Sequence, residues 1–312
     1  MILALILVWS GTAGAASILV LNLDTDPYDA NSPNATSSAA TISQLLTGMG
    51  VAHTPAFVGR DDHTTLADSS YYAPYDLVFI GVGVNCVIQV AHVFNTDEGQ
   101  ALVDYLESGG MVYMEGGDVW YQDPEYNDGF DFGDAFRVNP RAEMGLADLD
   151  QLEGTGIANG LEFDYGGDNC FIDVINHRQG ISFKVFENVN QYQEVSTVAV
   201  SYQSSAYKTI ACSFEFNGLT DGTGNNTQEY LLGVYLDFFG IMAGILGDVN
   251  DDGQVDADDV LLLGNYLADN IAPALMNLGA ADVDESGAIN LLDKVILHNF
   301  VAGNISTLPF TP

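Results

Sequence analysis

Two copies of one twelve-residue acidic segment near the carboxyl end restrict the fold of this chain more than any other feature. The first copy runs from Asp248 to Asp259 and the second from Asp282 to Asp293, so they start 34 residues apart. A pattern typical of an apolar helix follows each copy, over 260–267 and 294–301. An internal repeat of this kind predicts a small duplicated unit that is separate from the residues before about 247.

The polar positions of each copy have the spacing of a calcium-binding loop. Such a loop supplies oxygens from positions 1, 3, 5, 7, 9 and 12, and it needs a glycine at position 6 for a sharp turn. Gly253 and Gly287 occupy that position. The predicted ligands of the first ion are Asp248, Asn250, Asp252, the carbonyl of Gln254, Asp256 and Asp259. Those of the second ion are Asp282, Asp284, Ser286, the carbonyl of Ala288, Asn290 and Asp293. The alternative is a pair of acidic turns before two amphipathic helices.

With these loops, the segment from Gly247 to Gly303 resembles a type I dockerin, which has Asp at position 12 where the usual EF-hand has Glu. The resemblance implies a fold ordered by two Ca²⁺ ions. It also implies a cohesin-like domain of a scaffold or surface protein as partner, often within an extracellular polysaccharide-degrading system.

Cohesin contacts in that family come largely from loop positions 10 and 11 and from the middle of each helix. These positions hold Ala257 and Asp258, Leu291 and Leu292, Gly264 and Asn265, and His298 and Asn299. The Lys-Arg pair common in the family is absent from them. The alternative is a repeat that closes on itself and only stiffens the carboxyl end.

The charge of the chain excludes two classes of partner. Its 43 acidic and 7 basic residues give a formal net charge of −36. Nucleic acid and anionic membrane surfaces repel such a protein. Calcium loading, a saline habitat and solubility are each an ordinary explanation of the acidity.

The amino end has the order of an export signal. Residues 1–9 are an uninterrupted apolar run, and small residues follow up to Ala16. The run is too short for a membrane span, which needs about 20 apolar residues. We therefore expect residues 1–16 to be a signal peptide and the mature protein to be secreted, without a membrane span. The alternative is a buried first strand.

Strand and helix patterns alternate between residues 17 and 244. Apolar runs predict buried strands over 18–23, 76–81, 111–114 and 207–216. Helical spacing with start and stop signals predicts helices over 37–49, 96–108 and 227–239. This alternation predicts an α/β domain with a parallel sheet covered on both faces, over 17–244. A small all-α calcium-binding domain over 247–303 and a tail over 304–312 complete the expected organisation.

Residues 75–83, 101–117, 207–216 and 230–240 resemble the class I glutamine-amidotransferase-like domain of secreted bacterial proteins. The resemblance implies a flavodoxin-like sheet and, in active members, a Cys nucleophile on the turn after the strand that ends here at Glu115. This chain continues instead with Gly116, Gly117 and Asp118, without a thiol or hydroxyl. Because a carboxylate cannot replace a thiolate in acyl transfer, we expect no amidotransferase activity.

Other groups in the first domain are weaker candidates for chemistry. Asp173 and His177 could act as an orienting group and a base, but no nucleophile is near them in sequence. Apolar neighbours indicate that Cys86 is a buried inert thiol, and an export route would permit a Cys170–Cys212 disulfide.

An acidic cluster follows the first predicted strand. Asp24, Asp26 and Asp29, with Asp118 from a neighbouring strand end, could form a second metal or sugar site, or a solvated turn. Glu115 and Asp118 could be the paired carboxylates of a glycosidase, although their spacing specifies no separation. The aromatic stretch 120–136 could line a carbohydrate platform, and an ordered loop over the sheet is the favoured alternative.

These observations predict a secreted, calcium-binding protein whose dockerin-like module tethers a non-catalytic α/β domain to a cohesin-type partner, with no catalytic residues assigned. The alternative is an extracellular hydrolase, acting on polysaccharide or ester bonds, that the same module delivers.

The two loops should differ in affinity for calcium, because affinity follows the number of charged ligands. The first loop has four carboxylates at its ligand positions and the second has three, with Ser286 and Asn290 neutral. We predict that the second site is the weaker. Calcium titrations of Asp248→Ala and Asp282→Ala isolate each remaining site, and equal affinities would contradict the prediction.

Overall fold

The computed structural model describes residues 16–24, 37–59, 62–84, 92–144, 149–189, 195–241, 246–250, 255–268, 270–271, 276–284, 289–306 and 308. The chain divides into two compact units, Met1–Leu232 and Gly233–Pro312. The division falls inside helix α6, Gln228–Phe239. The predicted signal peptide lies outside the described residues, apart from Ala16.

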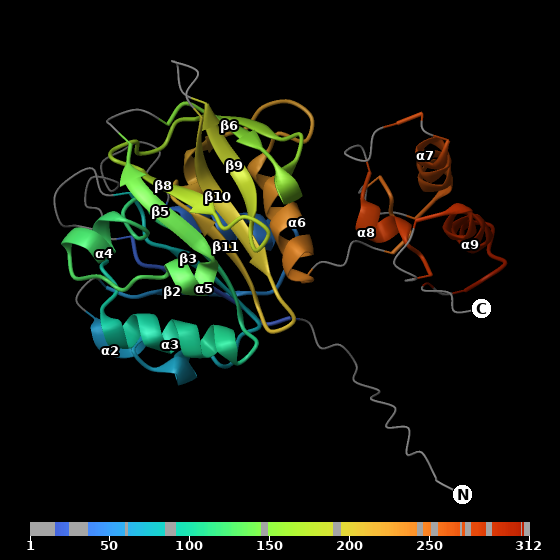
Figure 1. Cartoon of the computed structure of the whole chain (residues 1–312). Coiled ribbons are helices and arrows are strands. Elements are labelled where there is room, and N and C mark those ends of the chain that lie inside the picture. The colour runs from blue at the N-terminus through green and yellow to red at the C-terminus, as the bar shows by residue number, and fades with distance from the viewer. Residues whose placement is uncertain are drawn as a thin grey trace, which may run out of the picture. The chain divides into compact units, whose positions relative to one another are not determined.

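A ten-stranded mixed sheet organises the described part of the first unit, in the order β12-β7-β6-β9-β10-β11-β4-β3-β1-β2 (Figure 1). Its strands are β1 Ile18–Asn22, β2 Thr54–Phe57, β3 Leu77–Gly81, β4 Met111–Glu115, β6 Gln151–Gly154, β7 Glu162–Tyr165, β9 Phe183–Val189, β10 Val195–Gln203, β11 Lys208–Cys212 and β12 Leu219–Thr220. A separate two-stranded sheet pairs β5 (Val138–Glu143) with β8 (Asp173–His177) in antiparallel fashion.

One half of the large sheet is parallel, as predicted. Strands β2, β1, β3, β4 and β11 are neighbours that all run in the same direction. Every residue of β3 is buried, which explains its continuous apolar sequence. The four predicted strands therefore exist, although the one expected over 207–216 ends at Cys212.

The other half of the sheet is antiparallel, and the prediction of a parallel sheet did not include it. Strand β10 pairs with β11 and β9, and β6 and β7 continue the pairing outward. Short strands such as β7 bury only alternate residues. Because so short an alternation is a weak signal, the sequence alone did not predict strands between 138 and 203.

The described helices of the first unit include the three that were predicted, over 37–49, 96–108 and 227–239, and three short ones that the sequence did not predict. They are α1 Ser38–Gly48, α2 His63–Leu66, α3 Thr96–Glu107, α4 Gln122–Tyr126, α5 Gly133–Phe136 and α6, with 3₁₀ turns η2 Ser69–Tyr71, η3 Gly156–Ala158 and η4 Phe216–Gly218. The Ser37 hydroxyl accepts from the N–H of Ala40 at the start of α1. Asn95 and Glu98 form a capping box at the start of α3.

The aromatic stretch 120–136 contributes to the core. Trp120, Phe132 and Phe136 are almost completely buried, and the short helices α4 and α5 lie within the stretch. The indole N–H of Trp120 donates to the carbonyl of Cys212 at 2.8 Å. These rings pack against one another and are not arranged as an exposed carbohydrate platform.

The predicted Cys170–Cys212 disulfide was wrong. Cys170 is disulfide-bonded, whereas Cys212 keeps its thiol at the buried end of β11. In that central strand Cys212 pairs with Ala199 on one side and Glu115 on the other. Cys86 lies outside the described residues.

The second unit contains α7 Ala257–Leu267, α8 Leu278–Ala281 and α9 Leu291–Val301. Its core consists of Val249, Leu263, Ala281, Val283, Ile296 and Leu297. Helices α7 and α9 pack together, and both start with a capping box. None of the helices in the described ranges is long and apolar enough to cross a membrane.

Gly247 fills a narrow place in this core. Its φ is +99°, and an added Cβ would lie 2.8 Å from Leu297 Cδ1, 2.9 Å from Leu308 Cδ1 and 2.9 Å from Val255 Cγ1. Gly303 also has a positive φ, of +72°, but an added Cβ there would meet nothing within 4 Å.

Gly247→Ala should destabilise the second unit more than Gly303→Ala does. Both substitutions strain the backbone, but only the first also crowds the core, which typically costs about 1–3 kcal/mol. Thermal unfolding of the two variants in excess calcium measures the difference. Equal melting temperatures would show that the core accommodates the added methyl group at Gly247 without a loss of stability.

Candidate functional site

Three carboxylates of the second repeat converge on one point. Asp282, Asp284 and Asp293 each offer an oxygen, and these oxygens lie within 4.8 Å of one another. Asp293 is the third residue of α9 and is completely buried. One of its oxygens, Oδ2, accepts from the N–H of Asn290 at 2.8 Å. Its other oxygen, Oδ1, is buried without a well-directed donor among the described residues.

The electrostatics of this cluster favour a cation. Burial raises the pKa of Asp293. The N–H of Asn290 opposes this shift, and the charges of Asp284 and Asp282 add to it. Ionised carboxylates at this spacing repel one another, and a divalent ion between them removes the repulsion. Because all the donors are hard oxygens, the set fits calcium.

Within the described part of the chain, the position-12 carboxylate of the first repeat makes more backbone hydrogen bonds than that of the second. Asp259 is completely buried, and its Oδ1 accepts from the N–H groups of Val249 (2.7 Å) and Asn250 (3.0 Å). Its Oδ2 accepts from the N–H of Asp256 at 2.8 Å. The carboxylate thus ties the beginning of the loop to the start of α7.

The position-9 side chains cap the helices. Asp256 accepts from the N–H of Asp258 at 2.8 Å, and Asn290 accepts from the N–H of Leu292 at 2.8 Å. Asp248 is nearly buried, at 3% exposure. The remaining predicted ligands, Asp252, Gln254, Ser286 and Ala288, lie outside the described residues.

Several of the predicted partner-contact positions are exposed. Leu291 is 68% exposed and Leu292 is 47% exposed. Sequence reasoning missed Val295, 47% exposed, and Leu261, 63% exposed, which occupy equivalent positions in the two repeats. A large apolar residue at the same place in both copies, four residues after position 10, was the available signal.

In the first unit, the described carboxyl groups at or just beyond the carboxyl ends of β1, β4 and β11 include those of Asp24, Glu115, Asp118 and Glu215. Glu115 ends β4 and has no exposed surface. It accepts from the Tyr113 hydroxyl at 2.6 Å and from the N–H of Phe216 at 2.8 Å. Burial nevertheless raises the pKa of Glu115 to about 7.

Glu215, which the sequence did not single out, is 6% exposed and accepts from the N–H of Val84 at 3.3 Å. Asp24 packs against Gly83, where an added Cβ would lie 3.0 Å from its Cγ. Asp118 is half-buried, whereas Glu115 is buried, so the two are not presented together to a substrate. Asp26 and Asp29 lie outside the described residues.

Asp173 and His177 do not form the predicted pair. They stand at opposite ends of β8, four residues apart, which is about 13 Å along a strand. Asp173 instead accepts from the N–H groups of Trp120 (3.0 Å) and Tyr121 (2.8 Å). Burial, with a contribution from Asp118, raises the pKa of Asp173 to about 8.

Comparison with known proteins gives a family for the second unit only. The model of the type I dockerin domain matches residues 246–302. The complex of the third cohesin of ScaC with the ScaB dockerin, from Acetivibrio cellulolyticus, contains a similar chain: it is 35% identical, the match covers 21% of this chain and 92% of that one, and the TM-score is 0.19.

The first unit has only distant likenesses. A GH42 beta-galactosidase from G. stearothermophilus is 11% identical over 73% of this chain, with a TM-score of 0.45, and the match spans 30% of that protein. A putative ThuA-like protein from Bacteroides uniformis is 10% identical over 75% of this chain and 94% of its own, with a TM-score of 0.46. No curated protein matches the chain.

The buried carboxyl of Glu115 should make the first unit less stable as pH rises. Its pKa in the fold, about 7, lies above the ordinary value of 4.5, so its contribution is fully present below pH 4.5 and is lost through pH 7. Glu115→Gln should reduce this loss between pH 5 and pH 8 by on the order of 2 kcal/mol.

Urea unfolding of the first unit at several pH values, in excess calcium, measures the effect. Glu162→Gln, at an exposed position, is the matched control and should leave the pH dependence unchanged. If Glu115→Gln and the parent protein lost stability in parallel, the carboxyl would be ionised in the fold at neutral pH.

Proposed function

Because residues 246–302 form a type I dockerin domain, we propose that this protein docks onto a cohesin domain and brings its α/β unit to a scaffold or cell-surface assembly. The main support for this proposal is the convergence of Asp282, Asp284 and Asp293. Exposed leucines lie beside them at the start of the following helix. The dockerin of the similar Acetivibrio complex is bound to a cohesin, which supports the same class of partner here.

The exposed face of α9 is the proposed contact surface. Leu291, Leu292 and Val295 occupy its first turn and a half, and each is about half exposed or more. Burying a leucine side chain against a partner contributes about 1.5–3 kcal/mol. The equivalent positions of the first repeat are Ala257, Asp258 and Leu261, a less apolar set. We therefore infer that α9 carries the larger share of the contact.

Calcium binding should control this surface. The carboxylates of Asp259 and Asp293 are at once predicted ligands and the third residues of α7 and α9. Removal of the ions leaves converging negative charges at the start of both helices, which opposes folding of the unit. Docking in this proposal therefore requires two bound Ca²⁺ ions.

The first unit is proposed to be cargo. The order β2-β1-β3-β4-β11 of its parallel strands corresponds to the flavodoxin-like order, which supports an amidotransferase-like domain. The turn after β4 carries Gly116 and Gly117 instead of a nucleophile. We propose export through the signal peptide and work within an extracellular polysaccharide-degrading system. A hydrolase cargo is the alternative, with Asp118 the most accessible carboxylate of the turn after β4.

The docking proposal is tested by binding to immobilised type I cohesins, the third cohesin of ScaC among them. Leu291→Asp with Leu292→Asp should weaken binding by about 100-fold or more, since two apolar contacts become charged. Leu261→Asp on α7 is the matched control and should have a smaller effect. EGTA should abolish binding by the parent protein.

Binding that survives both EGTA and the leucine substitutions would overturn the proposal. So would failure to bind any cohesin of the panel while the calcium-loaded second unit is folded, as judged by circular dichroism. In that case the repeat would serve only to stiffen the carboxyl end.

A further inference from the structure

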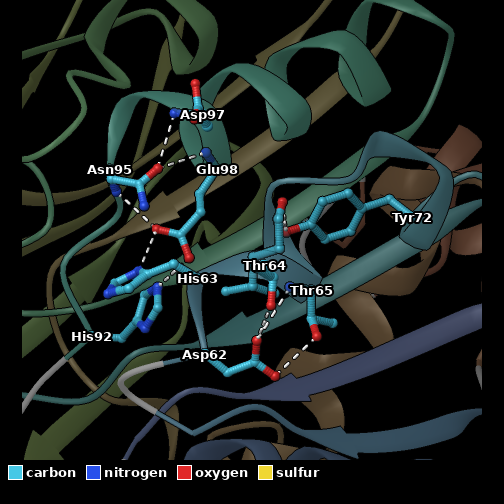
Figure 2. A network of polar contacts seen from close by, with 10 residues as sticks. Asp62, His63, Thr64, Thr65, Tyr72, His92, Asn95, Asp97 and Glu98 are labelled. Atoms are coloured by element: carbon cyan, nitrogen blue, oxygen red, sulfur yellow. Dashed lines mark hydrogen bonds and ion pairs between the residues drawn. The ribbon is translucent and has the colours of Figure 1, made fainter.

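A second set of metal-ligand side chains, of different chemistry, lies in the first unit. His63, His92 and Glu98 each offer a ligand atom, and these atoms lie within 4.8 Å of one another. His63 Nδ1 is 3.1 Å from Glu98 Oε2, and His92 Nε2 is 3.1 Å from Glu98 Oε1. Figure 2 shows the two imidazoles turned toward the same carboxylate.

The starts of two helices fix the positions of His63 and Glu98. His63 is the first residue of α2, where Asp62 caps the helix by accepting from the N–H of Thr65. Glu98 is the third residue of α3, and its Oε2 also accepts from the N–H of Asn95 at 2.8 Å. A backbone donor on a carboxylate is the kind of outer contact that orients a metal ligand.

The aromatic surroundings hold the second imidazole. The ring of His92 meets Phe94 edge-on, with centroids 5.1 Å apart, and is tilted by 40° to the ring of His63 at 5.2 Å. His92 and Glu98 are completely buried. The side chain of His63 is 46% exposed. Of the three side chains, it is therefore the one that is open to solvent.

We propose that His63, His92 and Glu98 bind one Zn²⁺ ion, with a further coordination position open to solvent beside His63. Two imidazole nitrogens and one carboxylate suit zinc, whereas calcium prefers oxygens throughout. Tetrahedral zinc with bonds of about 2.0–2.2 Å places neighbouring ligand atoms about 3.3 Å apart. The two 3.1 Å separations run to different oxygens of Glu98, so an ion held between the imidazoles would meet both carboxylate oxygens, and the ligand atoms, now within 4.8 Å of one another, would have to draw slightly closer.

The charge state of the cluster suits a metal ligand. Burial by itself raises the pKa of Glu98, but hydrogen bonds from His92, Asn95 and His63 outweigh it and lower the pKa overall. Glu98 is therefore an ionised carboxylate at neutral pH. To bind zinc, each imidazole would turn a nitrogen lone pair toward the ion and carry its proton on the other ring nitrogen.

A purely structural clamp is the competing explanation. The same hydrogen bonds join the start of α2 to the start of α3 without any metal. The two explanations differ in one measurable property, which is the affinity of the intact chain for zinc.

The test uses the full chain with calcium in excess, so that the acidic loops are occupied. Zinc is titrated in competition with a chromophoric zinc chelator, and one equivalent should bind. His63→Gln should weaken this binding by at least about tenfold, the loss typical of even an outer-shell contact. His53→Gln is the matched control, because His53 bonds instead to Ser43 and to the carbonyl of Val51.

Equal zinc affinity of the parent and His63→Gln proteins would overturn the proposal and favour the clamp, as would no zinc binding at all. Should His63→Gln fail to fold, NMR of the histidine ring protons in the parent protein decides. Zinc must then shift the resonances of His63 and His92 and leave those of His53 in place, and any other pattern refutes the site.

Discussion

The second unit depends on one buried carboxylate in each repeat. This carboxylate accepts hydrogen bonds from the backbone and is also a predicted calcium ligand. Asp259 and Asp293 accept backbone N–H bonds at the start of α7 and α9, and each is buried completely. Backbone donors alone do not neutralise a buried charge that has other carboxylates close by, as Asp293 has Asp282 and Asp284. A divalent ion does, and among the described residues the apolar core of this small unit centres on six buried side chains, with partly buried ones packed around them.

The first unit handles its carboxyl groups differently. Glu115 and Asp173 sit in the interior and are stabilised in their protonated forms, as their raised pKa values indicate. The pair of histidines around Glu98 keeps a third buried carboxyl ionised. This protein of net charge −36 thus accommodates the buried carboxyl groups discussed here in three ways. Those of the second unit lie at predicted calcium positions, Glu115 and Asp173 are stabilised in the protonated form, and Glu98 is paired with imidazoles.

The sequence was sufficient wherever a local rule applied. Helical spacing and the stop signals at Gly50 and Gly109 predicted α1 and α3 almost to the residue, although the cap of α3 is Asn95, one residue before the predicted start. The sequence was insufficient where the residues that contact each other come from distant segments of the chain. Strand β7 buries only Phe163 and is held by its pairing with β6, and Cys212 is placed by the pairing of β11 with β4. His63 and Glu98 lie 35 residues apart, so no spacing rule could have brought them together.

The packing around Gly247 joins the two ends of the dockerin unit. Its N–H donates to the carbonyl of Ala280, while Leu297 and Leu308, close to the carboxyl end, lie against its Cα. Entry and exit of the polypeptide are therefore neighbours. A module with adjoining ends can be joined to another protein, or inserted into one of its surface loops, without a long spacer. A force applied through the chain before Gly247 would therefore act on this packing, where the glycine, Leu297 and Leu308 meet.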